Sequence, residues 1–245
     1  MDPLIHLYMI CWNEEFILPF TLRYYSSFVD KIILYDNHCT DSSISIAKSF
    51  PQVEIRTLNT NDQFCEDSLI LIKNQAWKES RDKADWVIVC DVDEILYYPN
   101  IKSFLTLCKQ CQITLPLVNG FEMVCTDEDI IQPLDLIDQV KYGLESHFYS
   151  KNVIFNPNLI EDINYYPGCH QCSPTGLVTR FIDNKLKLLH YSYLGLNYSW
   201  NRKLVKGKRL SKKTINQGFA FHWQWNYEAH CEAYGDLLSK AKKVI

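Results

Sequence analysis

Residues 86–96, WVIVCDVDEIL in one-letter code, constrain the fold of this chain more than any other stretch. The apolar, β-branched first half predicts a buried strand, and Asp91, Asp93 and Glu94 follow at its end. Clustered carboxylates repel one another unless a positive charge lies between them. A hard divalent cation with oxygen ligands, bridging to substrate phosphates, meets this requirement. The alternative is a solvated loop with an acidic helix cap.

Strand and helix patterns alternate over the first hundred residues. Apolar segments at 4–11, 31–35 and 53–58 predict strands, each followed by a helical pattern, and Asn13 is expected to cap the first helix. This order predicts an α/β fold with a largely parallel sheet covered on both faces. Ligands bind such sheets at the carboxyl ends of the strands. We therefore expect Asp36 and Asn37 to share one sheet edge with the acidic cluster.

Composition excludes several classes of protein. The net charge of −4 argues against nucleic-acid binding, which needs a basic surface. No apolar run approaches the roughly 18 residues of a membrane span, and the first residues lack the basic segment of a signal peptide. We therefore expect a cytoplasmic protein. The 245 residues show no convincing linker, which predicts a single domain over residues 1–245.

Ten cysteines without an export signal indicate reduced thiols. Two pairs, Cys108/Cys111 and Cys169/Cys172, have the C-x-x-C spacing of zinc sites, but they lie far apart in the sequence. Cysteine is also an ordinary small apolar filler of cores. A structural zinc site is therefore the weaker of the two interpretations.

Four blocks of sequence occur in a fixed order over almost the whole chain. They are ICWNEE at 10–15, YDNHCTD at 35–41, the acidic strand at 86–96 and LHYSYLG at 189–195. Together they resemble the family 2-type glycosyltransferases of the GT-A fold, in particular a bacterial and viral subgroup. The resemblance implies a Rossmann-like, mostly parallel central sheet flanked by helices. It also implies a nucleotide-binding half (residues 1–100), an acceptor-side half (101–245) and a smaller C-terminal subregion on the acceptor side.

By this resemblance the chain transfers a sugar from a UDP- or GDP-sugar to an acceptor hydroxyl with the help of Mn²⁺ or Mg²⁺, with inversion, in the synthesis of surface glycans or glycoconjugates. Asp36 would contact the nucleotide base, and Asn13 and Asn37 would line the same pocket. Asp91 would face the ribose or the metal, and Asp93 would bind the metal directly. One departure from the pattern is Cys39, where the family usually has serine.

The catalytic base and the histidine roles are less firmly defined by the motifs. Glu122 is the first candidate for the base because it emerges from an apolar strand downstream of the metal motif, and Glu94 is its rival. His190 is expected at a third metal position or at the diphosphate, with a hydrogen-bonded core histidine as the alternative. His170 lies among turn-forming residues and is expected to contact the donor or acceptor sugar.

Positively charged residues complete the expected site. Lys73 would neutralise diphosphate charge, or it is a solvated helix lysine. A basic segment at 202–213 contains no acid. Through Arg202 or Arg209 it would contact the diphosphate, or it would rest on anionic lipid beside a lipid-linked acceptor; otherwise it is a solvated helical face. The expected partners are thus a nucleotide sugar and a glycan or lipid-linked acceptor.

Two other functions compete with this interpretation. Nucleotidyltransferases also place acidic pairs at strand ends to hold a metal and a triphosphate, but this chain has no glycine-rich phosphate loop near its N-terminus. A non-enzymatic, zinc-stabilised binding module would instead be built on the cysteine pairs. Tightly held stoichiometric zinc without nucleotide-sugar binding would identify such a module.

Overall fold

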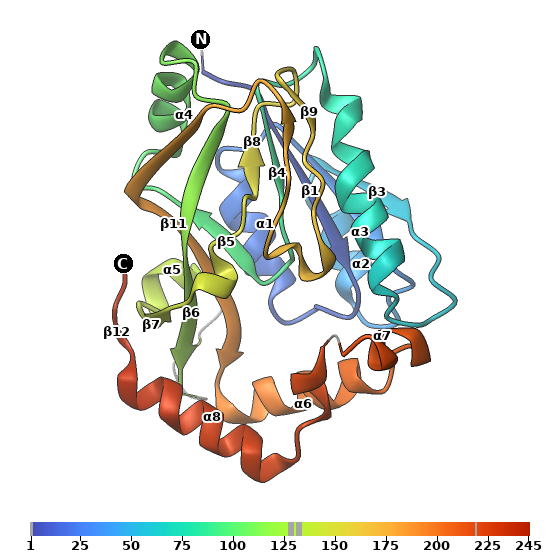
Figure 1. Cartoon of the computed structure of the whole chain (residues 1–245). Coiled ribbons are helices and arrows are strands. Elements are labelled where there is room, and N and C mark those ends of the chain that lie inside the picture. The colour runs from blue at the N-terminus through green and yellow to red at the C-terminus, as the bar shows by residue number, and fades with distance from the viewer. Residues whose placement is uncertain (1, 127–129, 131–133, 219) are drawn as a thin grey trace.

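The computed structural model describes residues 2–126, 130, 134–218 and 220–245, and Figure 1 shows how its elements are arranged. Strands and helices alternate along the first part of the chain, as the sequence predicts. Their bounds are β1 (Ile5–Cys11), α1 (Leu18–Ser26), β2 (Lys31–Asp36), α2 (Ser43–Lys48), β3 (Val53–Thr57), α3 (Glu66–Gln75), the 3₁₀ helix η1 (Ala76–Ser80), β4 (Trp86–Val89) and β5 (Glu94–Tyr97).

The first sheet has the strand order β3-β2-β1-β4-β8 within the described residues. Strand β1 runs parallel to β2 and to β4, and Leu7 pairs with Ile32 on one side and Ile88 on the other. The edge strand β8 (Ile154–Phe155) is antiparallel to β4. The expected mostly parallel sheet flanked by helices is thus confirmed.

Both faces of this sheet are covered, and the side chains of β1 alternate between the two apolar clusters that cover them. Leu7 and Met9 are buried in the core that contains α1, whereas Tyr8 points into a separate cluster around Trp77. Trp77 packs edge-on against Phe155, with ring centroids 4.8 Å apart. This second cluster also receives apolar side chains of α3. The carboxyl ends of the parallel strands are therefore held rigidly from two sides.

The expected helix cap at Asn13 was wrong. Helix α1 begins five residues later, at Leu18, with Pro19 in its first turn, where the fixed backbone angle of proline favours helix initiation. Asn13 instead has a positive φ of 49° and holds the loop that follows β2. Its side-chain carbonyl accepts a hydrogen bond from the backbone N–H of Thr40, at 2.8 Å.

The second sheet has the order β12-β7-β6-β11-β5 within the described residues. Its long central strand β11 runs antiparallel to β5 and parallel to β6. The remaining elements are α4 (Ile101–Gln110), β6 (Leu115–Cys125), α5 (Leu136–Gln139), β7 (Tyr142–Glu145), η2 (His147–Tyr149), β9 (Ile160–Asp162), η3 (Pro167–Cys169), β10 (Thr175–Gly176), β11 (Arg180–Leu194), α6 (Leu196–Gly207), α7 (Lys212–Asn216), η4 (Phe221–Gln224), α8 (Tyr227–Lys240) and β12 (Lys242–Lys243).

The two sheets exchange strands across the expected boundary near residue 100. Strand β5 belongs to the first hundred residues but joins the second sheet, and β8 belongs to the later part but joins the first. One apolar core contains buried residues of both. Helices α6, α7 and α8 cross the lower end of the molecule in Figure 1. Among the described residues, no helix combines the length and apolarity needed to cross a lipid bilayer.

Candidate functional site

A cavity of about 710 Å³ opens where the two sheets meet. It is lined by residues that follow the carboxyl ends of β1, β2 and β4, by the end of β11 and by one side of α6. Asn37, Asp91 and Asp93 all belong to this lining. The expected convergence of these polar residues at one sheet edge is therefore confirmed.

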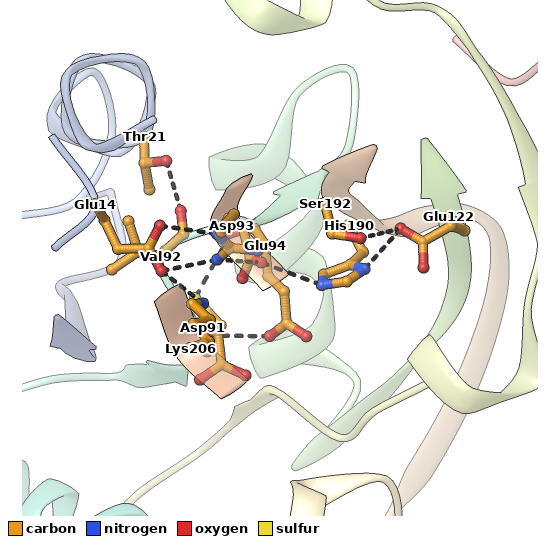
Figure 2. A network of polar contacts seen from close by, with 12 residues as sticks. Glu14, Thr21, Asp91, Val92, Asp93, Glu94, Glu122, His190, Ser192 and Lys206 are labelled. Carbon is orange, nitrogen blue, oxygen red and sulfur yellow. Dashed lines mark hydrogen bonds and ion pairs between the residues drawn. The ribbon is translucent and has the colours of Figure 1, made fainter. Parts of the chain in front are cut away.

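Two hydrogen bonds hold the acidic loop between β4 and β5 in place. The hydroxyl of Thr21, on α1, donates to the carbonyl oxygen of Val92 at 2.6 Å, and the backbone N–H of Asp91 donates to Glu94 Oε2 at 3.0 Å. Figure 2 shows how these bonds fix the loop. The side chains of Asp91 and Asp93 are thereby presented to the cavity, because the backbone between them cannot turn away.

Two lysines surround Asp91. Lys73 Nζ, from α3, lies 2.5 Å from one carboxylate oxygen, and Lys151 Nζ lies 3.4 Å from the other. Burial alone would raise the pKa of Asp91, but the two ammonium groups outweigh this effect and hold it well below its usual value. Asp91 is therefore ionised throughout the physiological range.

Asp93 is paired with cationic groups from the second half of the chain. Arg202 Nη2, from α6, lies 2.7 Å from Asp93 Oδ2, and His190 Nε2, from β11, lies 3.3 Å from the same oxygen. Arg202 also binds Glu14, which contacts Lys206 as well, each at 2.7 Å. Burial opposes ionisation of Asp93, yet Arg202 and His190 lower its pKa far below the usual value.

His190 links the acidic loop to Glu122. Its Nδ1 lies 2.8 Å from Glu122 Oε1, on the side opposite Asp93, and Figure 2 shows the imidazole between the two carboxylates. The two acids outweigh the effect of burial and raise the pKa of His190 to about 10. The hydroxyl of Ser192 donates to the same Glu122 oxygen at 3.1 Å, and Tyr149 stacks on the His190 ring, with centroids 3.9 Å apart.

The predicted metal ligands are only partly suited to a cation as they stand. Asp91 and Asp93 both line the cavity, and carboxylate oxygens are what Mn²⁺ and Mg²⁺ prefer. Both ring nitrogens of His190, however, already face carboxylates. Among the described residues, no three His, Cys, Asp or Glu side chains are grouped as a ligand set. The pair of aspartates therefore fits a cation whose other ligands come from substrate phosphates, as is usual for Mg²⁺.

The residues expected at the nucleotide base fall into two groups. Asn37 lines the cavity, and its side-chain oxygen accepts a hydrogen bond from the Thr60 hydroxyl at 2.8 Å. Asp36 and Asn13 do not belong to the described lining. Asp36 Oδ1 accepts the backbone N–H of Cys39 at 2.7 Å, and so it shapes the same loop that Asn13 holds.

Lys73, His170, Arg202 and Arg209 all line the cavity, as expected. The guanidinium of Arg209 lies over the Trp12 ring, 3.9 Å from its centroid, and Nε donates to the backbone oxygen of Asp62. His170 Nδ1 lies 2.5 Å from the Phe148 carbonyl oxygen. These residues are in place to contact a ligand.

The two candidates for the base differ in position. Glu122 belongs to the lining of the cavity, whereas Glu94 does not and its residue is 1% exposed. Glu94 Oε1 contacts Lys151 Nζ at 2.5 Å, and its other oxygen accepts the backbone N–H of Asp91. This geometry gives Glu94 the role of orienting the acidic loop and leaves Glu122 facing the ligand space.

Sequence reasoning gave no individual role to five charged residues of the cavity, although the last two lie in the basic segment at 202–213: Glu14, Glu66, Lys151, Lys203 and Lys206. Glu14 follows Asn13, the expected helix cap, but it lies outside α1 and is 6% exposed. The signal that identifies it is its place in the first sequence block, directly after β1. No local pattern marks Lys151, because its partners Asp91 and Glu94 are remote in the sequence.

The cysteine pairs give no support to a zinc module. All ten cysteines lie in the described part of the chain, and all are free thiols. Cys108 is buried on α4, whereas Cys111, just after that helix, is exposed. The described residues contain no cluster of three metal-ligating side chains around either pair. Cys108, Cys169 and Cys90 are buried among apolar residues of the two large clusters instead.

Comparison with known proteins found similarity to solved structures. The chain is similar to the crystal structure of S. aureus TarS, with a TM-score of 0.46 and 12% identity over 84% of this chain and 39% of that chain. A structure of S. aureus TarS 1-349 is similar with a TM-score of 0.44 and 10% identity, over 84% of this chain and 65% of that chain. The crystal structure of a mycobacterial protein is similar with a TM-score of 0.30 and 18% identity, over 49% of this chain and 41% of that chain. This chain thus spans less than two thirds of the length of each of these structures. Neither the protein-family models nor the curated proteins include a match.

Proposed function

We propose that this chain is a glycosyltransferase that moves a sugar from a nucleotide diphosphate sugar to an acceptor hydroxyl. The observation that carries the proposal is the cavity at the carboxyl ends of β1, β2 and β4, where Asp91 and Asp93 meet a set of cationic side chains. Its volume of about 710 Å³ is in the range of small-molecule sites. The four sequence blocks that resemble family 2-type glycosyltransferases all contribute residues to this cavity or to the loops beside it.

The donor diphosphate is proposed to lie between the acidic loop and α6. Lys73, Lys151, Arg202 and Lys206 line this part of the cavity and supply the positive charge that a diphosphate requires. Asp91 and Asp93 would hold Mn²⁺ or Mg²⁺, with diphosphate oxygens completing its coordination. When bound, the cation would neutralise the charge that develops on the departing diphosphate. Asn37 would contact the nucleoside of a UDP- or GDP-sugar.

The acceptor hydroxyl is proposed to be deprotonated by Glu122. This side chain lines the cavity, and its Oε1 is held by His190 and Ser192, so its orientation is fixed before a substrate binds. A base on the side of the sugar opposite the leaving diphosphate leads to inversion of the anomeric carbon. His170, on the same wall, would contact one of the two sugars.

The acceptor is proposed to be a glycan or a lipid-linked sugar of surface-glycan synthesis. In support, Leu204, Val205 and Ile215 on α6 and α7 are more than 40% exposed, and Lys208 and Lys212 are exposed near them. Apolar side chains beside lysines favour contact with an anionic lipid surface. Lipid contact would bring a lipid-linked acceptor to the cavity from that side.

A thermal-shift screen of UDP- and GDP-sugars, with and without Mn²⁺, tests the proposal. A donor that binds the native chain raises its melting temperature by mass action, and we expect a larger rise with metal present. Asp91→Asn and Asp93→Asn should each abolish the metal-dependent part. Asp236→Asn removes an exposed acid on α8 and should leave that part unchanged. An unaltered metal-dependent shift in both cavity variants would exclude the aspartates from the site.

A further inference from the structure

Lys203 is a buried lysine in the cavity wall. It lies on α6 and is 8% exposed, and Ser199 one turn earlier lines the same wall. Among the described residues, six lysines and arginines line the cavity, and Lys203 and Arg209 are the two that have no carboxylate within 4 Å. Burying a cationic group without a counter-ion is unfavourable.

The surroundings of Lys203 fix its ammonium group in place. Its Nζ lies 2.9 Å from His230 Nδ1, on α8, and His230 Nε2 lies 3.0 Å from the Ser199 hydroxyl. That hydroxyl in turn donates to the backbone oxygen of Leu196. The donors therefore follow one order along this chain of hydrogen bonds. Lys203 donates to His230 Nδ1, and His230 Nε2–H donates to the Ser199 hydroxyl.

Two aromatic rings flank the same ammonium group. Its distance to the ring centroid is 4.5 Å for Trp225 and 5.4 Å for Tyr193, and both residues line the cavity. The pairing of β11 with β6 shifts register between His190 and Tyr193. This irregularity lets both Ser192 and Tyr193 line the cavity, although neighbouring strand residues normally point to opposite faces. Lys203 thus lies on the same side as Ser192, which binds Glu122.

The acids of the cavity already have partners, and none of those described forms an ion pair with Lys203. Glu14, Asp91, Asp93 and Glu122 each contact a lysine, arginine or histidine. The remaining acid of the described lining, Glu66, accepts the backbone N–H of Gly168 at 2.6 Å. Glu122 attracts Lys203 without forming an ion pair with it, so an anion in direct contact with the ammonium group would have to come from a ligand.

We propose that Lys203, with Trp225 and Tyr193, forms an anion-binding subsite for the acceptor, and that the acceptor sugar carries a phosphate or a carboxylate. The assignment to the acceptor rests on the proposed function, because Tyr193 beside Lys203 adjoins Ser192, whose hydroxyl binds the proposed base Glu122. The aromatic rings provide flat apolar surfaces for the sugar ring, while the ammonium group binds its charged substituent. In agreement, burial lowers the pKa of Lys203 to about 8, and the attraction of Glu122 offsets this effect only in part.

Titrations without donor nucleotide test this subsite, with Trp fluorescence as the readout because Trp225 adjoins the ammonium group. The probes are glucose 6-phosphate, glucuronate and glucose at equal ionic strength and neutral pH. We expect one or both anionic sugars to bind, and Lys203→Met to weaken that binding about tenfold or more, the effect of losing a charge-assisted hydrogen bond. Lys203→Arg should retain most of it. Lys212→Met, which removes an exposed lysine on α7, should bind as the native chain does.

The two anionic probes distinguish the sources of charge. Binding of glucose 6-phosphate alone assigns a phosphate to the acceptor, and binding of glucuronate alone assigns a carboxylate. Three results would each overturn the proposal. They are glucose binding as tightly as both anions, neither anion binding, and Lys203→Met binding the anions as the native chain does. These titrations contain no donor nucleotide, so they are independent of the thermal-shift screen. If the native chain bound an anionic sugar but showed no Mn²⁺-dependent shift with nucleotide sugars, only the proposed function would be contradicted.

A labelling experiment on the native chain covers the case in which Lys203→Met does not fold. Lysines are acetylated with acetic anhydride, with and without the anionic sugar that binds, and are quantified by mass spectrometry. The sugar should protect Lys203 and leave Lys212 labelled as before. Equal labelling of Lys203 in both samples would overturn the subsite.

Discussion

Arg202 Nη2 lies 2.7 Å from Asp93 Oδ2, and this contact joins α6 to the acidic loop after β4. The same guanidinium binds Glu14 through Nε and Nη2, at 3.1 and 2.7 Å. One arginine thus ties the end of β1 and the end of β4 to the C-terminal helices. Both acids are more than 90% buried, so the pairing is shielded from water and from salt.

Removal of this guanidinium should strongly destabilise the chain. Arg202→Met retains most of the aliphatic stem but leaves Asp93 and Glu14 buried with less compensation. We expect the free energy of unfolding to fall by about 3–5 kcal/mol, as for the breaking of other buried ion pairs. Urea denaturation measures the change. The control, Lys240→Met, removes an exposed lysine that pairs with Asp236, and should cost less than about 1 kcal/mol. Equal costs for the two variants would contradict this account of Arg202.

Glu94 and Lys151 should behave as a coupled pair. Lys151 Nζ lies 2.5 Å from Glu94 Oε1, and both residues are less than 5% exposed. Lys151→Met leaves a buried carboxylate unpaired, whereas the double variant with Glu94→Gln removes both charges. We expect the double variant to be more stable than the sum of the single losses predicts, by about 1–3 kcal/mol. Urea denaturation of the four proteins of the cycle measures this coupling, and strictly additive losses would refute it.

Gly120 should tolerate no side chain. A Cβ at this position would lie 2.0 Å from the backbone carbon of Tyr149, so Gly120→Ala must displace η2. We expect a loss of about 1–3 kcal/mol from overpacking, together with weaker ligand binding, because Tyr149 stacks on His190. Thermal unfolding and nucleotide titration measure the two effects.

The matched control for Gly120 is Gly235, in α8. A Cβ there meets nothing within 4 Å, and alanine is the better helix former. Gly235→Ala should therefore raise the free energy of unfolding by up to about 1 kcal/mol. If Gly120→Ala were as stable as Gly235→Ala, the backbone of η2 could not lie as close to Gly120 as the structure places it.

The sheet and its acidic edge could be predicted because local patterns encode them. The run ending at Val89 is apolar and β-branched, and the carboxyl ends of parallel strands share one edge, so Asn37, Asp91 and Asp93 had to converge. The charge that compensates the aspartates could not be predicted in the same way. Sequence reasoning assigned it to a metal and placed Lys73 and Arg202 at the diphosphate. In the structure, Lys73, Lys151 and Arg202 contact the aspartates directly, and no local pattern links these residues to their acids.

The role of Asn13 and the contact between Lys203 and His230 could not be predicted for a similar reason. Asn13 has the residue type of a helix cap, yet Pro19 sets the start of α1 and leaves Asn13 to bind Thr40. His230 and Lys203 carry no motif, and they meet only because α6 packs against α8. Contacts of this kind depend on the tertiary arrangement of segments that are individually unremarkable in sequence.

His230 should make the stability of the chain sensitive to acid. Burial, aided by the nearby ammonium group of Lys203, lowers the pKa of His230 from 6.5 to about 4. Between these two values the unfolded chain binds a proton at this residue and the folded chain does not. The stability associated with neutral His230 is therefore present above pH 6.5 and is lost as the pH falls toward 4.

The size of this effect is given by a comparison of the native chain with His230→Gln. Glutamine keeps polar atoms near Lys203 and Ser199 but has no proton to bind in this range. Between neutral pH and pH 4 we expect the native chain to lose roughly 2–3 kcal/mol more than the variant in free energy of unfolding, from the difference between the two pKa values. Urea denaturation across the pH series measures this difference. Lys203→Met removes the neighbouring charge and should reduce the acid loss, since the pKa of His230 then returns toward its ordinary value. Parallel pH profiles for all three proteins would show that His230 does not remain neutral in the folded chain.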